Sequence, residues 1–169
     1  GKTSLLHALL GFVPMQSGSL QVFGRARCRE ADFVPLRGPL GLLFQDPVDQ
    51  LFGPTVADDV AFGPRNMGQD RAQAGQLALR TLAALQLEHL AERPVQQLSG
   101  GEQRLVALAG VLAMSPRVLL LDEPSNGLDE ASCERLFACL LDTGLPMLIA
   151  SHDQTLVQRL GTRILTLPA

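Results

Sequence analysis

The sequence lacks tryptophan and tyrosine, has few cysteines, and carries no large excess of either charge. Its 14 Lys and Arg residues face 17 Asp and Glu residues, so the net charge at pH 7 is −3. Without a surplus of positive charge the chain has little with which to neutralise a nucleic-acid backbone, and we expect no nucleic-acid partner. Cys28, Cys133 and Cys139 are odd in number and follow no metal-ligand spacing. They indicate buried, reduced thiols rather than a disulfide framework or a zinc site.

Long apolar runs are also missing. No segment approaches the roughly 20 apolar residues that a membrane-spanning helix needs, because Arg, Asp or Pro interrupts the longest candidates. The opening Gly-Lys-Thr is not followed by the apolar region of a secretory signal. Hydrophobic residues still make up 46% of the 169 residues, which suits one folded domain with a core. We therefore expect a soluble domain that reaches a membrane only through a partner.

The most informative segment is Leu98-Ser-Gly-Gly-Glu102, followed by the apolar run Val118–Leu121 and then Asp122-Glu123. Ser99 and the glycines predict the start of a helix, where free backbone N–H groups bind phosphate. The apolar run predicts a buried strand with two carboxylates at its end, a position from which a carboxylate can hold Mg²⁺. Together these features indicate a site for a nucleoside triphosphate.

Two shorter motifs lie near the ends of the sequence. Gly1-Lys2-Thr3-Ser4 matches the last residues of a P-loop, G-x-x-x-x-G-K-[ST], in which the lysine binds phosphate and the hydroxyl binds Mg²⁺. The apolar residues up to Leu10 match the helix that follows such a loop. Ser151-His152-Asp153 follows another apolar run, where a strand would end.

The pattern of the whole chain predicts strands that alternate with helices, and hence a mainly parallel α/β sheet. We expect a loop over 25–39 and a helix-rich inserted subdomain over approximately 48–114. The strands are expected at 18–24, 40–44, 117–122, 146–150 and 163–167, and the helices at 4–10, 70–90, 100–114, 129–142 and 154–160.

In this order the motifs resemble those of the ATP-binding subunit of ABC transporters, and the resemblance covers essentially the whole chain. It implies a P-loop NTPase fold, ATP and Mg²⁺ as ligands, and ATP hydrolysis. It also implies a dimer, homo- or heteromeric, in which each ATP is held between two subunits. Glu102 occupies the fifth position of the signature motif, where Gln is usual.

The resemblance implies a role for each motif residue. Glu123 would orient or deprotonate the attacking water, His152 would hydrogen-bond the γ-phosphate, and Gln45 would be the Q-loop residue that contacts Mg²⁺ or the water. The implied metal ligands are Thr3, Gln45 and Asp122. The implied nucleotide-binding residues of the P-loop are Gly1, Lys2, Thr3 and Ser4. A second implied group faces the nucleotide of the opposite subunit and consists of Ser99, Gly100, Gly101 and the D-loop residue Asp129.

Each motif taken alone has a simpler interpretation. A Ser-His-Asp after a strand is usually a loop feature, Asp-Glu-Pro can be a strand end before a helix cap, and Leu-Ser-Gly-Gly-Glu can be only a capped helix. The joint order and spacing favour the nucleotide site. Gly1 matches the last glycine of the P-loop, so the motif's first half and its preceding strand are absent from this sequence. We therefore expect the 169-residue chain alone to bind ATP weakly or not at all.

The segments Phe44–Phe52 and Thr55–Pro64 resemble the ATPases of energy-coupling-factor and cobalt/nickel importers. The resemblance implies integral membrane partners, import of a vitamin or metal ion, and a position on the cytoplasmic face of the membrane. Two alternatives remain: a soluble ABC ATPase acting on ribosomes or DNA, and an inactive ABC ATPase. This part of the chain contains Phe52, Val56, Val60 and Phe62 with the acidic residues Asp58 and Asp59. We expect these residues to form a docking groove for a membrane helix, or else to pack in the core of the inserted subdomain.

Overall fold

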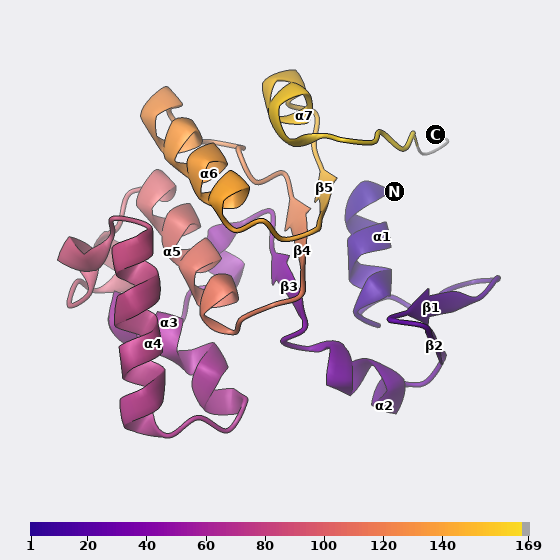
Figure 1. Cartoon of the computed structure of the whole chain (residues 1–169), viewed down its shortest axis with the longest axis horizontal. Helices are drawn as coiled ribbons and strands as arrows, with labels where there is room; N and C mark the ends of the chain where they lie inside the picture. Colours follow the sequence, from indigo (N-terminus) through magenta and orange to yellow (C-terminus); the bar gives the residue numbers. More distant parts are fainter. Residues whose placement is uncertain (167–169) are drawn as a thin grey trace.

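A three-stranded parallel sheet lies at the centre of the computed structural model, which describes residues 1–166. Its strands are β3 (Leu40–Leu43), β4 (Val118–Asp122) and β5 (Met147–Ala150), paired in the order β3-β4-β5 (Figure 1). The α-helices are α1 (Lys2–Leu9), α2 (Glu30–Phe33), α3 (Val56–Asn66), α4 (Arg71–Ala84), α5 (Gly100–Ala113), α6 (Glu130–Asp142) and α7 (Gln154–Leu160). Shorter elements are the strands β1 (Leu20–Val22) and β2 (Arg25–Arg27) and the 3-10 turns η1 (Val34–Leu36), η2 (Pro47–Asp49), η3 (Glu88–Leu90) and η4 (Val95–Gln97). The expected α/β class with a parallel sheet is confirmed.

Both faces of the sheet are covered, which explains the unbroken apolar sequence of β4. Because side chains alternate along a strand, Leu120 faces α1 together with Leu6, whereas Leu119 and Leu121 pack in the cluster that contains α5 and α6. Figure 1 shows α1 on one side of the sheet and α5 and α6 on the other. The sheet is thus the middle layer of three.

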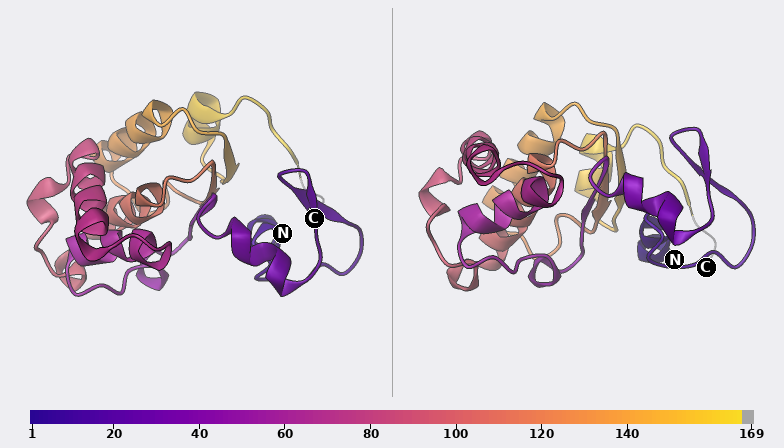
Figure 2. Two further views of the ribbon diagram at one scale, coloured as in Figure 1. Left: turned by 60° about the horizontal axis from the view of Figure 1, so that its bottom comes forward. Right: turned by 90° about the horizontal axis from the view of Figure 1, so that it is seen from below.

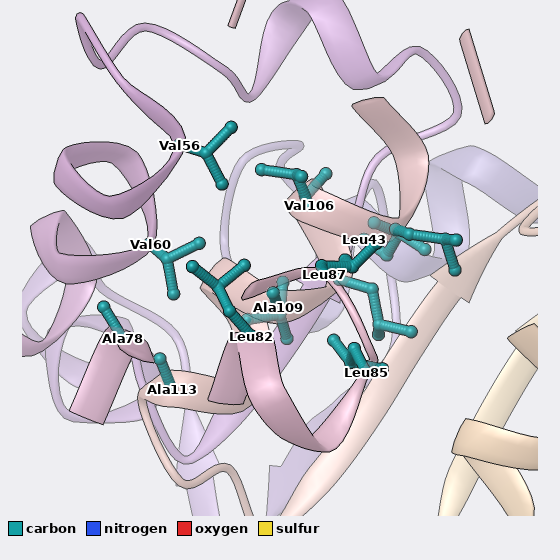
Figure 3. Close-up of a cluster of buried hydrophobic side chains, with 14 of the residues drawn as sticks. Leu43, Val56, Val60, Ala78, Leu82, Leu85, Leu87, Val106, Ala109 and Ala113 are labelled. Carbon is teal, nitrogen blue, oxygen red and sulfur yellow. The ribbon is translucent and has the colours of Figure 1, made fainter. Parts of the chain in front are cut away.

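The larger core lies where α3, α4 and α5 pack together beside the sheet (Figure 3). Val60 from α3, Leu82 from α4 and Ala109 from α5 are all fully buried there. The expected helix over 70–90 ends at Ala84, and residues 88–90 form a separate 3-10 turn. Gln86, with φ of 59°, breaks the helical path between them.

The segment 25–39 was expected to be a loop, and that prediction is wrong. Residues 25–27 form β2, which pairs antiparallel with β1 through the two-residue turn Phe23-Gly24. Both turn residues have positive φ, 52° and 73°, as a tight hairpin turn requires. Asp32 then accepts hydrogen bonds from the backbone N–H groups of Cys28 and Arg29, which starts α2. Figure 2 shows this hairpin at the opposite end of the molecule from α3 and α4.

Three smaller expectations concern the last strand, the cysteines and membrane-spanning helices. No strand forms over 163–166, and Leu167, the last residue of that expected strand, lies outside the described residues. Ile164 is 72% exposed, because no neighbouring strand pairs with this stretch in the described part of the chain. Cys28, expected to be buried, is exposed, whereas Cys133 and Cys139 are partly buried. None of the helices described is long and apolar enough to cross a membrane.

Candidate functional site

The motif residues meet at the edge of the sheet where the parallel strands end. Gln45 follows β3, Glu123 follows β4, and His152 follows β5. Lys2, the first residue of α1, lies against the same edge. Binding sites of open α/β sheets form at this edge, because the ends of parallel strands lie side by side there.

Glu123 is the centre of the cluster. Its Oε1 lies 3.4 Å from Lys2 Nζ and 3.6 Å from His152 Nε2. Its Oε2 accepts hydrogen bonds of 3.1 Å from Ser151 Oγ and from the backbone N–H of His152. Lys2 Nζ is also 2.6 Å from His152 Nε2. A carboxylate, an ammonium group and an imidazole therefore share one small volume, with the His152 side chain largely in solvent.

The backbone of Glu123 has an unusual conformation. Its φ is 44°, in the left-handed region that costs energy for a residue with a side chain. Its N–H donates to the carbonyl of Ala150 at 2.8 Å, and its own carbonyl accepts from Arg104 Nη1 at 3.2 Å. These two bonds hold a strained peptide directly after β4, so the Glu123 side chain leaves the strand in a fixed direction.

The surroundings of Asp122 indicate whether this site could hold a metal ion. The residue is 1% exposed, and neither of its carboxylate oxygens has a hydrogen-bond partner. A cavity of about 430 Å³ beside it is also lined by Thr3 and Gln45. No cluster of three or more His, Cys, Asp or Glu side chains suited to a metal occurs within residues 1–166. Mg²⁺ bound with a nucleotide needs only one or two carboxylates beside phosphate and water oxygens, so these residues fit it.

The remaining phosphate-binding candidates lie at the start of α1. Gly1 precedes the helix and makes no side-chain cap, so the first backbone N–H groups of α1 keep no capping partner. Thr3 and His7 line the cavity, whereas Gly1 and Ser4 are exposed and do not line it.

The signature residues form a second cluster away from the cavity. Ser99 Oγ accepts from the N–H of Glu102 at 3.3 Å, and Glu102 Oε2 accepts from the N–H of Ser99 at 2.7 Å. The hydrogen bond from the backbone N–H of Ser99 is the main reason why the pKa of Glu102 is lowered. A side chain on Gly101 would come within 3.0 Å of Ser132 Oγ, so α5 begins close against α6. Ser99 and Gly100 remain exposed at this helix start.

Asp129 belongs to the same region. Its carboxylate caps α6 by accepting from the N–H of Ser132 at 2.7 Å, and this bond is the first cause that lowers the pKa of Asp129. Neither Asp129 nor Ser99–Gly101 lines the cavity. The structure therefore brings two groups of motif residues to one strand edge: Lys2, Glu123 and His152 contact one another, and Thr3, Gln45 and Asp122 line the cavity. The signature residues and Asp129 form a separate group.

Sequence reasoning missed two polar contacts around the site. Arg104 lies on the buried side of α5 and contacts the loops after β3 and β4. An arginine among the apolar positions of an expected helix was the available signal. Ser125 Oγ donates a hydrogen bond to Asp153 Oδ2 at 2.7 Å, and this bond is the main reason why the pKa of Asp153 is lowered. Asp153 also caps α7, and an Asp just before an expected helix could have been recognised as a cap.

The expected docking segment divides into core and surface. Val56 and Val60 are fully buried and Asp59 is 7% exposed, so these three belong to the interior. Phe52 and Phe62 are exposed and pack edge to face with ring centroids 4.6 Å apart. Asp59 accepts from the N–H groups of Phe52 and Gly53, and burial raises the pKa of Asp59. The surface part is thus an aromatic pair supported by a buried carboxylate.

Comparison with known proteins identifies the family to which the chain belongs. A family model described as ABC transporter matches residues 1–126. An uncharacterized ABC transporter ATP-binding protein of Haemophilus influenzae is 52% identical over 167 residues, which cover 99% of this chain and 77% of that protein. The cobalt import ATP-binding protein CbiO of Rhodobacter capsulatus is 42% identical over 168 residues, which cover 97% of this chain and 60% of that protein.

A solved structure extends the agreement to three dimensions. The structure of cbiO1 from Clostridium perfringens, described as part of the ABC transporter complex cbiONQ, matches with a TM-score of 0.80 at 34% identity. The match covers 90% of this chain and 63% of that chain. The expected family is confirmed by the sequence match and the expected fold by the structural one. The chain belongs to the ABC transporter family, as the ATP-binding domain of an ATP-hydrolysing transporter subunit.

Proposed function

We propose that this chain powers the import of a small substrate, a vitamin or a metal ion such as cobalt or nickel, through an integral membrane partner. The proposal is supported by the relative described as a cobalt import ATP-binding protein, 42% identical, and by the similarity to cbiO1. The aromatic segment around Phe52 and Phe62 gives it a physical basis, because exposed aromatic pairs favour protein contacts.

The observation that carries the catalytic part is the convergence of Lys2, Glu123 and His152 at one strand edge. Lys2 places a positive charge where β- and γ-phosphate oxygens would be neutralised. Glu123, held by Ser151 and the His152 backbone, is placed to orient the attacking water and accept its proton. The exposed His152 side chain can hydrogen-bond the γ-phosphate that the water attacks.

The fit of Asp122 and Thr3 makes them the proposed holders of Mg²⁺, with Gln45 on the same cavity wall. When bound, the ion would neutralise charge on the phosphates. Asp122 lines this cavity, and its two buried carboxylate oxygens make no hydrogen bond within residues 1–166, so they remain available to an ion.

Two kinds of partner complete the proposal. A second ATPase subunit, the same or related, would receive the exposed start of α5 at Ser99–Gly101 with Asp129 beside it. Membrane subunits would contact the aromatic pair, with the exposed Asp58 nearby, which would hold the protein at the cytoplasmic face of the membrane. The helical part over approximately 48–114 would then act as the subdomain between the membrane contact and the signature residues.

The catalytic assignment is tested by Glu123→Gln in a purified ATPase that carries a complete P-loop, because the 169-residue chain alone is expected to bind ATP weakly. Every nucleotide measurement below uses the same protein. We expect hydrolysis to fall at least a hundredfold while ATP binding remains, because the amide keeps the shape but accepts no proton. Glu92→Gln, at an exposed glutamate away from the site, is the control and should leave turnover unchanged. Turnover in Glu123→Gln close to the unmodified level would remove Glu123 from catalysis.

The transport assignment is tested by Phe52→Asp, compared with Phe23→Asp on the hairpin. Both phenylalanines are exposed, but only Phe52 belongs to the aromatic pair. Copurification from detergent-solubilised membranes should recover a polytopic membrane protein with the unmodified ATPase and with Phe23→Asp, and lose it with Phe52→Asp. Uptake of labelled cobalt or nickel ions and of vitamins into cells then identifies the substrate. Recovery of ribosomes or DNA would contradict the transport proposal.

A further inference from the structure

Arg104 is a buried arginine whose guanidinium group contacts the backbone of two site loops. The residue is 4% exposed and lies on α5 directly before its buried apolar positions. Its Nη2 donates to the carbonyl of Gln45 at 2.6 Å, and its Nη1 donates to the carbonyl of Glu123 at 3.2 Å. Within the described residues Arg104 makes no ion pair, although a buried arginine usually has a carboxylate partner.

The two carbonyls need such a donor because they have left the sheet. Gln45 comes two residues after the end of β3, and Glu123 comes directly after β4. The positive φ of Glu123 turns its peptide away from the strand, so its carbonyl no longer faces a neighbouring strand. Both hydrogen bonds are partly buried, so water could replace the arginine at these carbonyls only in part. Arg104 therefore stabilises the strained conformation from which the Glu123 side chain is directed.

A second contact ties the same loop to the same helix. Gln50 Oε1 accepts from the N–H of Phe44 at 3.2 Å, and Gln50 Nε2 lies 3.4 Å from the carbonyl of Ala107. Ala107 is three residues after Arg104, so both contacts lie on one face of α5. Of the two loops, Gln50 contacts the one after β3, whereas among the hydrogen bonds of residues 1–166 those of Arg104 join the loops after β3 and β4.

We propose that Arg104 is a positioning residue for ATP hydrolysis, which holds Gln45 and Glu123 at a fixed spacing on α5. This inference rests on the proposed catalytic role of Glu123. Its consequence is a direct mechanical link, because the helix that carries Arg104 begins at the signature residues, of which Ser99 and Gly100 are exposed. A change in the position of α5 moves the backbone of Glu123 with it.

Arginine suits this position better than lysine. The guanidinium presents separate N–H groups on a rigid plane, and here two of its nitrogens reach two different carbonyls. An ammonium group has three N–H donors, but they share one nitrogen on a flexible chain, so it cannot hold two carbonyls apart as separate guanidinium nitrogens do. Lysine at this position would preserve the charge and lose the fixed spacing.

The test uses Arg104→Lys and Arg104→Met in the purified ATPase, with Leu108→Ala as the control. Leu108 is a fully buried residue of the same helix that donates no side-chain hydrogen bond, so its truncation destabilises α5 without touching either carbonyl. The measurements are kcat, KM, nucleotide affinity, melting temperature and amide hydrogen exchange over residues 44–50 and 122–126.

We expect kcat to fall at least tenfold in Arg104→Met and at least threefold in Arg104→Lys, with KM and nucleotide affinity changed less than threefold. Exchange should become faster in both segments, and Leu108→Ala should lower the melting temperature without this selective change. Should Arg104→Met fail to fold, Arg104→Lys carries the test alone. An Arg104→Lys protein with unmodified kcat, or losses that only follow melting temperature, would overturn the proposal. Failure of Glu123→Gln to stop hydrolysis would overturn the catalytic role of Glu123 instead, so the two failures are distinguishable.

Discussion

At the scale of single residues, the site combines charged side chains that are buried, although such residues usually lie on the surface, with a strained backbone. Within residues 1–166, the buried carboxylate of Asp122 has no hydrogen-bond partner and the buried Arg104 makes no ion pair, while Glu123 has a strained backbone. Each feature costs stability in the absence of a ligand. Such costs gather at functional sites, because the missing partner is supplied by what binds there.

Asp122 allows this cost to be measured. In Asp122→Asn we expect a higher melting temperature than the unmodified protein in EDTA, because a neutral amide is cheaper to bury than an unpaired carboxylate. For a protein of this size, each kcal/mol gained in the free energy of unfolding raises the melting temperature by about 2–4 °C. Addition of Mg²⁺ and ATP should raise the melting temperature of the unmodified protein but not that of the variant. Glu92→Gln is the control, and equal stabilisation of all three proteins by Mg²⁺ and ATP would contradict the metal role.

Asp59 gives a prediction of pH dependence. Burial raises the pKa of Asp59 in the folded state, so folding retains a proton that the unfolded chain releases. The stabilising contribution of Asp59 is therefore complete below its unfolded pKa of about 3.9 and is lost as the pH rises through the folded pKa. Asp59→Asn keeps an oxygen acceptor for Phe52 and Gly53 and removes the charge.

The measurement for Asp59→Asn is urea unfolding from pH 4 to pH 7. The gain in free energy of unfolding over the unmodified protein should increase as the pH rises. Because both proteins share every other titrating group, the difference between them reports Asp59 alone. A difference that is constant with pH would show that the burial of Asp59 does not control its titration.

At the scale of elements, helix starts do much of the functional placement. Ser99, Asp129 and Asp153 each cap the helix that follows, and each belongs to a motif. A capping residue must lie at the end of its helix with its side chain near the free N–H groups. The same side chains are therefore held where a phosphate could approach, and a cap and a binding residue cannot be told apart from position alone.

Substitutions at Ser99 separate the two roles. Ser99→Ala should cost about 1 kcal/mol of stability through loss of the cap. Ser99→Asp should keep the cap, because aspartate is an equally good cap. If Ser99 faces the nucleotide of a second subunit, the added negative charge should prevent ATP-induced dimerisation more severely than Ser99→Ala does. The measurements are thermal melting and size-exclusion chromatography with ATP in the Glu123→Gln background, and normal dimerisation of Ser99→Asp would leave Ser99 as a cap only.

At the scale of the whole molecule, the spacing between the sheet and α5 positions the site. Gly41 of β3 permits this close approach, because a Cβ there would lie 2.4 Å from Val111 Cγ1 and 3.1 Å from Pro116 Cβ. Any change in the approach alters the distance between α5 and the strand ends that carry Gln45 and Glu123. Packing far from the chemistry therefore controls the geometry at the strand edge.

Gly41→Ala tests this packing. We expect a loss of about 1–3 kcal/mol in the free energy of unfolding, because the new methyl group overfills the contact between β3 and α5. Val111→Ala in the same chain should restore part of the loss, since it removes the clashing methyl groups. Gly110→Ala has open space around its Cβ and should be neutral or slightly stabilising. Additive effects of Gly41→Ala and Val111→Ala would contradict direct contact between the two side chains.

Local pattern was sufficient for many of the elements. The apolar run of β4, the cap at Ser99 and the helix that follows Asp129 all depend on residues close together in sequence. The hairpin over 20–27 was missed because its strands are short and its turn contains Phe23, a residue that rarely takes positive φ. The expected strand at 163–167 depended on a neighbouring strand, and sequence pattern carries no information about that neighbour.

The amino-acid order specifies which chemical groups this protein carries and how they follow one another, because motifs and caps are local patterns. Which of these groups meet depends on how the chain folds in three dimensions. Lys2 and His152 are 150 positions apart and their nitrogens lie 2.6 Å from each other. Arg104 reaches Gln45 and Glu123, which are 59 and 19 positions away. Such contacts follow from the parallel order of three strands and the packing of α1 and α5 against them, and that packing depends on the whole core rather than on any local preference.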